Sequence, residues 1–414
     1  MREGLRYLVA TVTVSLAVLC GTAAFNYIVD PYDINQMFRW PGVNATRPEA
    51  FTHARMHKAL ELAGRRPAIA IFGSSRAAVG FSTDCDCLGG MRTQRYNAAV
   101  PASNIFECAR MFEDAVNLGN LRRAVISLDF FQFNGNYTTK PDFDEDLLCR
   151  EDDRFYALRM NLRKLRIYIA KDTLMSSLAT ISRQKRAFND YLFAADGSED
   201  PRPLERSIVR NGGQHALFRL SEIGYANGGY LPGGRPFTFN ARAGVSTMSY
   251  LAEMVRIARQ RSVDLRLVIA PTHVRDLEEI DALGLWNEVE AWKRELVTVV
   301  AESGPGEQVQ LWDFSEYSEI TEEKVPALGD QSSRMRWYWE SSHFKKELGS
   351  EILRTVFGSG EKSELMSGFG SRLDPINIEA HLAQIRRNRE DYRRANSREV
   401  SEIRGIVDQC RTFR

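Results

Sequence analysis

The sequence predicts an α/β protein with a mostly parallel sheet covered by helices on both faces, preceded by one N-terminal transmembrane helix. Short apolar runs that are too short for helices predict buried strands, and these runs lie at 68–72, 124–130, 265–270 and, less regularly, 309–314. Amphipathic helical patterns lie between and after these runs. Strands that alternate with such helices are typical of a parallel sheet whose two faces are both buried.

Two helices are predicted from apolar residues at spacings of three and four, which place one stripe on the core side. The first stripe consists of Leu285, Val289, Trp292, Leu296 and Val299. The second consists of Phe344, Leu348, Ile352 and Val356, and it stops at Gly358. We interpret both stripes as core faces.

The transmembrane helix is predicted from the uncharged and mostly apolar segment 7–29. A helix of this length crosses the roughly 30 Å hydrocarbon layer. Arg2 and Arg6 precede it and Asp30 follows it, so the positive-inside rule puts the body outside the cytoplasm. A cleaved signal peptide and a soluble helix are the alternatives. The anchor is favoured over the signal peptide because the apolar run is long and continues beyond the small residues at 22–24.

The remaining chain is organised around the predicted strands. We expect an anchor at 1–29, a connector at 30–66, the α/β domain at 67–358 with an irregular insertion at about 149–240, and a charged helical tail at 359–414. Within that tail, the residues from Ile376 onward predict one long exposed helix.

Composition excludes some functions. The 55 Lys and Arg residues nearly balance the 54 Asp and Glu residues, giving a net charge of +1. A nucleic-acid-binding protein needs a basic surplus to displace counterions, so no nucleic-acid partner is expected. Glycine and proline are near average, which argues against a collagen-like or broadly disordered chain.

The six cysteines leave the redox compartment open. Cys20 falls in the predicted anchor, and a disulfide that joins Cys85 or Cys87 to Cys108 is expected in an exported body. No histidine stands at ligand spacing from Cys85 and Cys87, so we expect neither a metal site nor a cofactor.

The first strand is followed by Gly73-Ser74-Ser75-Arg76. A serine directly after a buried strand can project its hydroxyl at the edge of the sheet, where backbone N–H groups surround a reacting oxygen. A turn that simply caps the next helix has the same sequence. Ser75 is therefore a candidate nucleophile that needs support from a second motif.

That second motif is the segment 339–344, Trp-Glu-Ser-Ser-His-Phe. We expect His343 to open a helix with Ser341 or Ser342 as its N-cap, so that the helix dipole disfavours a resting imidazolium. Glu340 can accept a hydrogen bond from one ring nitrogen and leave the other as a base. A surface Glu–His pair beside a capping serine is the alternative.

Together these motifs resemble the SGNH (GDSL-like) hydrolase superfamily, whose fold is a three-layer α/β/α sandwich. The Gly-Ser-Ser-Arg turn, the Asp-Pro-Tyr turn at 30–32 after a single anchor, and the segment 338–344 are most similar to the membrane-anchored SGNH-like proteins of bacterial cell-surface polysaccharide acylation. Alginate O-acetyltransferase-type proteins and the D-alanyl transfer protein of teichoic acid synthesis are examples. The resemblance implies that Ser75 is the nucleophile, His343 the base and Glu340 the orienting acid.

The chain departs from this family at the oxyanion hole. The family's glycine block has no match in 96–104, and Asp129 stands where an amide donor is expected. An ionised carboxylate cannot donate to an oxyanion. We expect backbone N–H groups near Ser75 and Ala102, or the Asn104 side chain, to take this part.

Three further residues have a functional and a structural interpretation. Arg76 could hold a carboxylate or acyl carrier, or form a salt bridge to Asp129. His273 follows the third strand and could bind substrate at the same sheet edge, or make a structural hydrogen bond. Asp313 follows the fourth strand and is a fallback for the acid.

Two functions follow as hypotheses. The first is an extracytoplasmic acyl transferase or esterase, anchored in a bacterial inner membrane, that acts on a cell-surface or exported polysaccharide or its precursor. Family resemblance suggests an acetyl group and a membrane acyl-donor protein as a partner. The second is a catalytically inactive glycan-binding or scaffold component of a polysaccharide export or modification complex.

Overall fold

The computed structural model describes residues 2–35, 38–184, 191–241, 244–304, 306–358 and 366–412. The chain forms two compact units. The first unit combines 1–64 with 141–193, and the second combines 65–140 with 194–414. The expected connector and the first part of the expected insertion thus belong to one unit, whereas 194–240 belong with the sheet.

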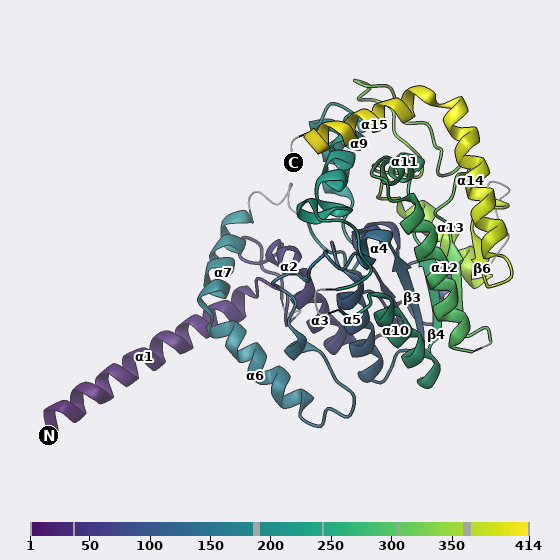
Figure 1. The fold of residues 1–414 in the computed structure, drawn as a ribbon. Helices are drawn as coiled ribbons and strands as arrows, with labels where there is room; N and C mark the ends of the chain where they lie inside the picture. Colours follow the sequence, from purple (N-terminus) through teal and green to yellow (C-terminus); the bar gives the residue numbers. More distant parts are fainter. Residues whose placement is uncertain are drawn as a thin grey trace. The chain divides into compact units, whose positions relative to one another are not determined.

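The second unit contains a six-stranded sheet in the order β2-β1-β3-β4-β5-β6, of which β3, β4 and β6 are labelled in Figure 1. The strands are β1 (Ile69–Phe72), β2 (Arg95–Asn97), β3 (Arg123–Leu128), β4 (Asp264–Ile269), β5 (Val309–Asp313) and β6 (Ser371–Leu373). β1 to β5 are parallel, and β6 is antiparallel to β5. The predicted mostly parallel sheet and all four predicted strands are confirmed, whereas β2 and β6 were not predicted.

The strand order places a topological switch point at β1. The next strand in sequence, β2, pairs with one side of β1, and β3 pairs with the other. The connections that leave β1 and β3 therefore diverge, and ligands in open α/β sheets bind in the crevice that such a divergence creates at the carboxyl ends of the strands. Ser75 follows β1 and Asp129 follows β3.

Helices connect the strands of the second unit, and the last helices of the chain follow β6. They are α4 (Ser75–Gly80), α5 (Ile105–Asn117), α8 (Arg202–Arg210), α9 (Gln214–Gly224), α10 (Met248–Gln260), α11 (Val274–Ala282), α12 (Trp286–Glu302), α13 (Lys346–Phe357), α14 (Ile378–Ala395) and α15 (Ser397–Thr412). The two predicted amphipathic helices correspond to α12 and α13 and are confirmed.

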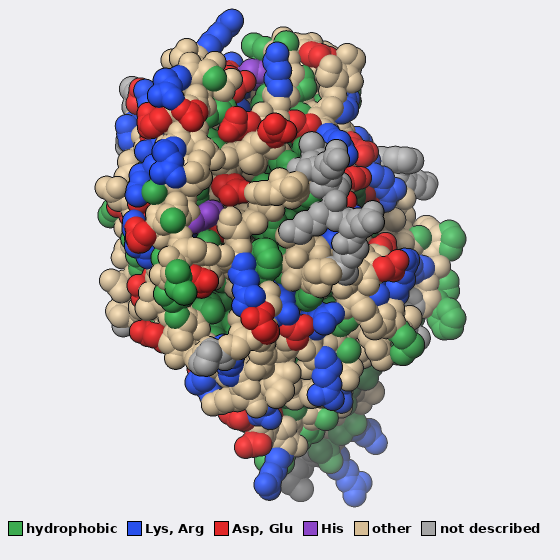
Figure 2. Space-filling model, turned by 90° about the vertical axis from the view of Figure 1, so that its right-hand side faces the viewer, with side chains coloured by type: hydrophobic (Ala, Val, Ile, Leu, Met, Phe, Trp, Pro, Cys, Tyr) green, Lys and Arg blue, Asp and Glu red, His purple; other side chains and the backbone are tan. Residues whose placement is uncertain are grey.

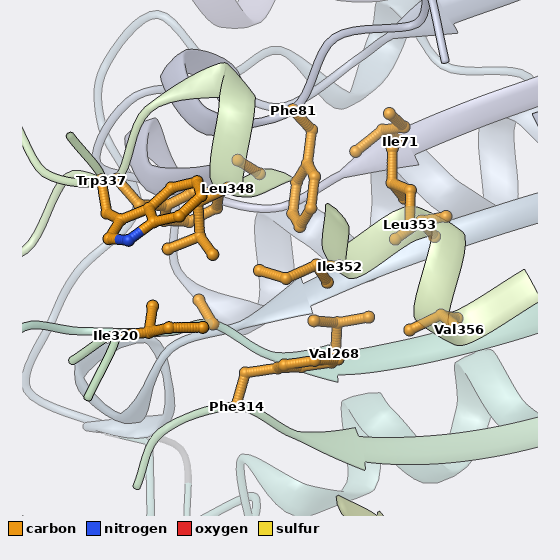
Figure 3. Packing of buried hydrophobic residues seen from close by; sticks show 14 of the residues in the cluster. Ile71, Phe81, Val268, Phe314, Ile320, Trp337, Leu348, Ile352, Leu353 and Val356 are labelled. Carbon is orange, nitrogen blue, oxygen red and sulfur yellow. The ribbon is translucent and has the colours of Figure 1, made fainter. Parts of the chain in front are cut away.

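One core cluster joins α13 to the sheet (Figure 3). Leu348 and Ile352 of α13 pack with Ile71 of β1 and Val268 of β4, and all four side chains are buried. Burial of each such side chain contributes roughly 1.5–3 kcal/mol. The predicted stop at Gly358 follows α13 in the left-handed conformation, with φ 62°. This cluster fixes the position of α13 and of the loop before it.

The first unit contains α1 (Arg2–Val29), α2 (Glu49–Thr52), α3 (Ala54–Arg65), α6 (Tyr156–Ile169) and α7 (Lys171–Arg183). α1 is long and apolar enough to cross a membrane, with a mean hydropathy of 2.1 over its most apolar window, and that window is not buried. Near its C-terminal end, Asn26 is buried against α6 and α7.

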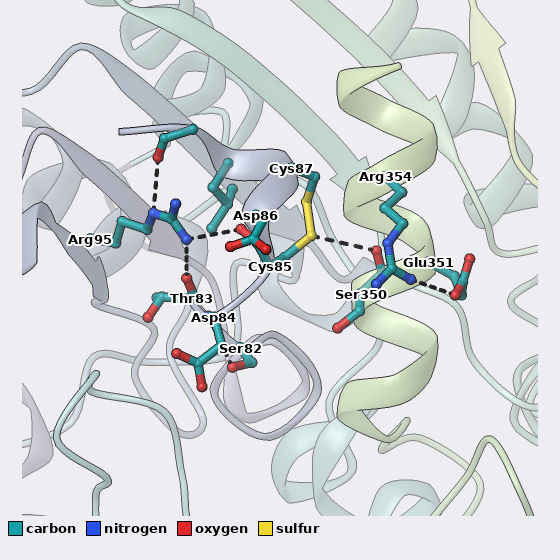
Figure 4. The surroundings of a disulfide bond; sticks show 12 residues. Ser82, Thr83, Asp84, Cys85, Asp86, Cys87, Arg95, Ser350, Glu351 and Arg354 are labelled. Carbon is teal, nitrogen blue, oxygen red and sulfur yellow. Dashed lines mark hydrogen bonds and ion pairs between the residues drawn. A yellow bond between two sulfur atoms is a disulfide. The ribbon is translucent and has the colours of Figure 1, made fainter. Parts of the chain in front are cut away.

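Two predictions about the second unit are wrong. The tail does not form one long helix, because the chain breaks at Asn396 between α14 and α15. Cys108 is not in a disulfide. Its thiol is buried in α5, whereas Cys85 and Cys87 are bonded to each other (Figure 4).

The surroundings of that disulfide explain the difference. The segment around Cys85 is held by Arg95 of β2, whose guanidinium donates to the carbonyls of Thr83 and Cys85, each at 2.9 Å. On its other side lies Ser350 of α13 (Figure 4). The two cysteines therefore face each other across one short turn.

Acidic and basic side chains are interspersed on the face of the molecule drawn in Figure 2. The near-neutral net charge is thus a local property of this face as well as an average over the sequence.

Candidate functional site

The turn between β1 and α4 requires glycine at position 73. Gly73 has φ 143°, a conformation that residues with a side chain rarely adopt. A Cβ atom there would lie 2.8 Å from Cβ of Ser127 and 3.0 Å from Cβ of Ala77. Glycine therefore lets the chain turn sharply between strand and helix, and Ser75 becomes the first residue of α4.

The neighbouring Ser74 caps the helix. Its Oγ accepts from the backbone N–H of Arg76 at 3.2 Å and donates to the Asp129 carboxylate after β3 at 2.5 Å. Ser74 is thus the N-cap of α4, and it ties the ends of β1 and β3 together. The Ser75 hydroxyl is left to face the second motif.

That motif folds as a tight turn. The N–H of Trp339 donates to the carbonyl of His343 at 2.9 Å and closes it. Inside the turn, the Glu340 carboxylate accepts from the N–H groups of Ser342 at 3.1 Å and His343 at 2.8 Å. The carboxylate therefore bends back over its own backbone.

The expectation that His343 opens a helix is wrong. α13 begins at Lys346 and has no side-chain cap. Ser342 instead hydrogen-bonds to Glu340 and to Tyr225, so it belongs to the turn. The helix dipole therefore cannot be what sets the charge of His343.

His343 bridges the two motifs. Its Nε2 lies 2.8 Å from the Ser75 Oγ, and its Nδ1 contacts Oε1 of Glu340. An ionised carboxylate only accepts hydrogen bonds, so Nδ1 carries the proton, and in the neutral ring Nε2 is free to accept from Ser75. This is the arrangement of a nucleophile, a base and an orienting acid.

The electrostatics of this pair follow from its burial. The side chains of His343 and Glu340 are 15% and 3% exposed. Burial lowers the pKa of His343, but attraction and hydrogen bonding from Glu340 outweigh it, so that pKa is raised from its ordinary value. Burial raises the pKa of Glu340, yet His343 and the N–H of Ser342 lower it to about 2. Glu340 is therefore ionised at neutral pH.

One donor to an oxyanion is present beside Ser75. Its backbone N–H lies in the first turn of α4, where N–H groups have no acceptor within the helix. The Asn104 amide does not serve here, because it donates to the carbonyl of Tyr137 and the hydroxyl of Thr139 while its oxygen caps α5. Nearby, Ala102 has φ 54°, a strained value for a non-glycine residue.

Arg76 is a structural residue in this fold. Its side chain is 3% exposed, and the guanidinium lies 3.5 Å from Asp129 and 3.2 Å from Asp276. It also donates to the hydroxyl of Tyr230 at 3.3 Å. The expected substrate-binding role is replaced by the salt bridge that the sequence offered as its alternative, because both carboxylates are buried and need a cation.

His273 is also structural. Its Nδ1 accepts from the N–H of Arg275 as the N-cap of α11, and its Nε2 donates to the carbonyl of Glu323 at 2.7 Å. Burial lowers its pKa to about 3, so the ring is neutral. With both nitrogens engaged and 1% of the residue exposed, it cannot bind substrate.

Asp313, the alternative candidate for the orienting acid, forms its ion pairs with other residues. Asp313 pairs with Lys293 at 2.7 Å and with His381 at 2.8 Å. Glu340, and not Asp313, is therefore the carboxylate that contacts His343.

Two glycines bring the motifs together. A Cβ on Gly80, the last residue of α4, would lie 2.1 Å from the ring of Phe344. A Cβ on Gly349 of α13 would lie 1.9 Å from the carbonyl oxygen of Gly80. The absence of side chains at both positions lets α4 and α13 approach closely, which positions His343 against Ser75.

A hollow of about 340 Å³ lies in the second unit, and Ser75, Glu340 and His343 are not among the residues that line it. Its lining includes Phe106, Tyr137 and Tyr250. Gln132, also in its wall, donates to the Ser103 hydroxyl at 3.2 Å, and that hydroxyl donates to the carbonyl of Gly73 at 3.0 Å. The hollow is thus linked to the Ser75 turn by two hydrogen bonds.

Sequence reasoning missed three residues of the site. Tyr225 contacts Ser342 from the π-helix η6 (Tyr225–Gly229), and Asp276 and Tyr230 surround Arg76. Asp276 lies in the first turn of α11, and only its position after β4 could have indicated it.

Comparison with protein-family models, with curated proteins and with solved structures found no match to this chain. Within the described ranges, no group of three or more His, Cys, Asp or Glu side chains is arranged to hold a metal ion.

Proposed function

We propose that the protein is a serine-dependent acyl transferase or esterase of the SGNH-like class, with the three-layer sandwich of that superfamily. The observation that carries the proposal is the contact of Ser75 with His343, which in turn contacts Glu340. The position of Ser75 at the switch point of the sheet adds support, because α/β proteins bind their ligands there.

The geometry supports a two-step reaction. His343 Nε2 takes the proton of Ser75 as Oγ attacks an ester carbonyl, and the N–H of Ser75 donates to the developing oxyanion. The carbon–oxygen bond to the donor alcohol breaks, and His343 returns the proton to that alcohol. The acyl group then passes from Ser75 to a sugar hydroxyl or to water, with His343 again as the base.

We assign the reaction to the outer side of a bacterial inner membrane. The support is the apolar helix α1, with arginines before it and aspartates after it, and the Cys85–Cys87 disulfide, since disulfides persist in oxidising compartments. The acceptor is then a cell-surface or exported polysaccharide, and a membrane acyl-donor protein supplies the acyl group, which we take to be acetyl.

The hollow lined by Phe106, Tyr137 and Tyr250 fits a glycan acceptor. Phe106 and Tyr250 meet edge to face, with ring centroids 5.2 Å apart, and Thr138 and Thr139 line the same wall. Aromatic rings and hydroxyl groups in one concave surface suit a sugar ring, which has apolar faces and polar edges.

A second candidate is a glycan-binding or scaffold protein without catalysis. It is favoured by the carboxyl group of Asp129, which accepts from Ser74 where the family has an amide donor, and by the engagement of the Asn104 amide within the protein. The Ser75 N–H is then the one oxyanion donor that we identify.

The test uses the full chain in lipid nanodiscs with a chromogenic acetyl ester. We expect Ser75→Ala and His343→Ala to lose at least about 100-fold in turnover, as general-base catalysis contributes 10²–10⁴-fold. Ser249→Ala, at an exposed position of α10, is the matched control and should retain full turnover. Equal turnover in all variants would support the scaffold.

A second readout does not need an acceptor glycan. A fluorophosphonate should add covalently to Ser75 in the wild-type chain and not in His343→Ala, as measured by peptide mass spectrometry. No adduct at Ser75 would contradict an activated serine.

A further inference from the structure

The helix α6 in the first unit has an exposed apolar face. Leu158, Leu162, Leu165 and Ile169 recur at helical spacing, and their exposed fractions are 58%, 51%, 53% and 39%. Phe155, directly before the helix, continues the stripe and is 73% exposed. A contiguous exposed apolar face of this kind marks an interaction surface.

The opposite side of α6 is already packed. Met160 and Tyr168 are buried, so the helix does not need its leucine face to join the unit. The leucines are therefore available to a surface outside the described chain.

Basic side chains border this face. α6 carries Arg159, Arg163, Lys164 and Arg166 and no acidic residue. A groove of about 300 Å³ is lined by Phe155, Leu158 and Leu162 together with the three arginines and Asp146. Arg159 and Arg163 pair with Asp153 and Asp144, which fixes them at the edge of the groove. An apolar stripe beside arginines is typical of helices that lie in a membrane interface.

The contact between α6 and α1 indicates how deep in the membrane the leucine face lies. Asn26 of α1 donates to the carbonyl of Tyr168 at 2.7 Å, and the Tyr27 and Tyr168 rings meet edge to face at 5.5 Å. At a rise of about 1.5 Å per residue, the segment from Tyr7 to Tyr27 spans roughly 30 Å, the thickness of the hydrocarbon layer. The C-terminal end of α6 is thus fixed where α1 leaves that layer (Figure 1).

We infer that α6 lies in the outer leaflet of the membrane, with its leucine face among the acyl chains and Lys164 and Arg166 at anionic headgroups. The inference rests on α1 as a membrane span. It goes beyond the anchor, because it adds a second membrane contact that restricts how the first unit is oriented on the bilayer.

Depth-dependent quenching in nanodiscs tests this contact with the full chain. The nanodiscs contain phosphatidylcholine with 30% phosphatidylglycerol, and either 5-doxyl or 12-doxyl phosphatidylcholine. A fluorescent NBD label is placed on Leu162→Cys in a Cys20→Ala background. The other thiols, Cys108, Cys149 and Cys410, are buried and should not react.

The matched control is Ala157→Cys in the same background, which is exposed and lies about 140° around the helix from Leu162, outside the leucine face. We expect 5-doxyl lipid to quench the label at 162 at least twofold more than the label at 157. Equal quenching at the two positions would overturn the inference. Shielding of the 162 label only after addition of a membrane-protein extract would also overturn it, because the occupant would then be a protein.

A label on native Cys20 separates the anchor from α6. We expect 12-doxyl lipid to quench it strongly, since Cys20 lies within the span. Quenching at Cys20 without quenching at 162 would reject the α6 contact alone, and no quenching at Cys20 would reject both. A Leu158→Ser, Leu165→Ser variant should keep its unfolding temperature in detergent, because both side chains are exposed.

Discussion

Glu340 sets the charge of His343, so its replacement should change the pH profile of the reaction. The base must be neutral, and Glu340 raises the pKa of His343 above its ordinary 6.5. Turnover of wild-type protein should therefore rise with pH through a value above 6.5. In Glu340→Gln the attraction is lost and burial lowers the pKa, so the rise should shift to lower pH. The rate should fall by about 10³–10⁴-fold, as when other triads lose their carboxylate. Ester turnover from pH 5 to 9 measures both effects.

Glu340→Asp is the control that separates the effect of the negative charge from the effect of side-chain length. It keeps the carboxylate but shortens the side chain that accepts from the N–H groups of Ser342 and His343. We expect its pH profile to stay nearer to that of the wild type than the profile of Glu340→Gln. A profile in Glu340→Gln identical to the wild type would show that Glu340 does not set the pKa.

Arg76 neutralises two buried carboxylates, so Arg76→Met should unfold more easily. Loss of one partner of a buried ion pair costs about 3–5 kcal/mol. Burial raises the pKa of Asp276, even with Arg76 beside it, to about 6. Protonation therefore relieves the unpaired charge at low pH, and the loss of stability should be larger at pH 8 than at pH 5. Urea unfolding at both pH values measures it.

Arg354→Met is the matched control, because Arg354 pairs with Glu351 while 45% exposed. Such surface pairs contribute about 0–1 kcal/mol. Equal losses in the two variants would contradict the structural role of Arg76.

At the same scale, the sequence predicts Ser75, Glu340 and His343 because each lies in a short local motif. It could not assign Arg76 and His273, since their roles depend on partners far along the chain, Asp276 and Glu323. The residue type shows which interactions a side chain can make, but the residues around it in the fold determine which of them it makes.

The close approach of α4 and α13 depends on Gly80, which makes Gly80→Ala a test at the scale of elements. The added methyl would overlap the Phe344 ring, and overpacking of this kind costs about 1–3 kcal/mol. Because Phe344 follows His343, turnover should fall together with stability. Thermal unfolding and ester turnover, measured on the same sample, check this.

Gly405→Ala in α15 is the control, since a Cβ there meets nothing within 4 Å. Glycine weakens a helix interior, so this variant should gain about 0.5–1 kcal/mol. A stable, active Gly80→Ala protein would show that the two helices can separate without consequence.

Elements were predictable where burial alone defines them. β1 is a continuous apolar run, and β4 is apolar apart from Asp264 and Arg266, as expected for parallel strands covered on both faces. β2 was missed because it has three residues and two of them, Arg95 and Asn97, are polar. Their donors are satisfied by backbone carbonyls, which hydropathy cannot show.

At the scale of the whole molecule, the two units could not be predicted, because each combines segments that are separated in the sequence. Residues 141–193 share a unit with 1–64, although the first strands of the sheet lie between them in sequence. Composition showed only the anchor, because its residues are contiguous.

The arginines before α1 and the aspartates after it predict a fixed orientation, which single cysteines can test in spheroplasts. In a Cys20→Ala background, Ser333→Cys lies on the exposed body and Glu3→Cys at the N-terminal end of α1. With the body outside, a membrane-impermeant maleimide should label Ser333→Cys equally before and after lysis. It should label Glu3→Cys only after lysis, because about 30 Å of hydrocarbon separates the two sides. The reverse pattern would place Ser75 in the cytoplasm and remove exported polysaccharide as its substrate, whereas labelling of both before lysis would mean that α1 does not span the membrane.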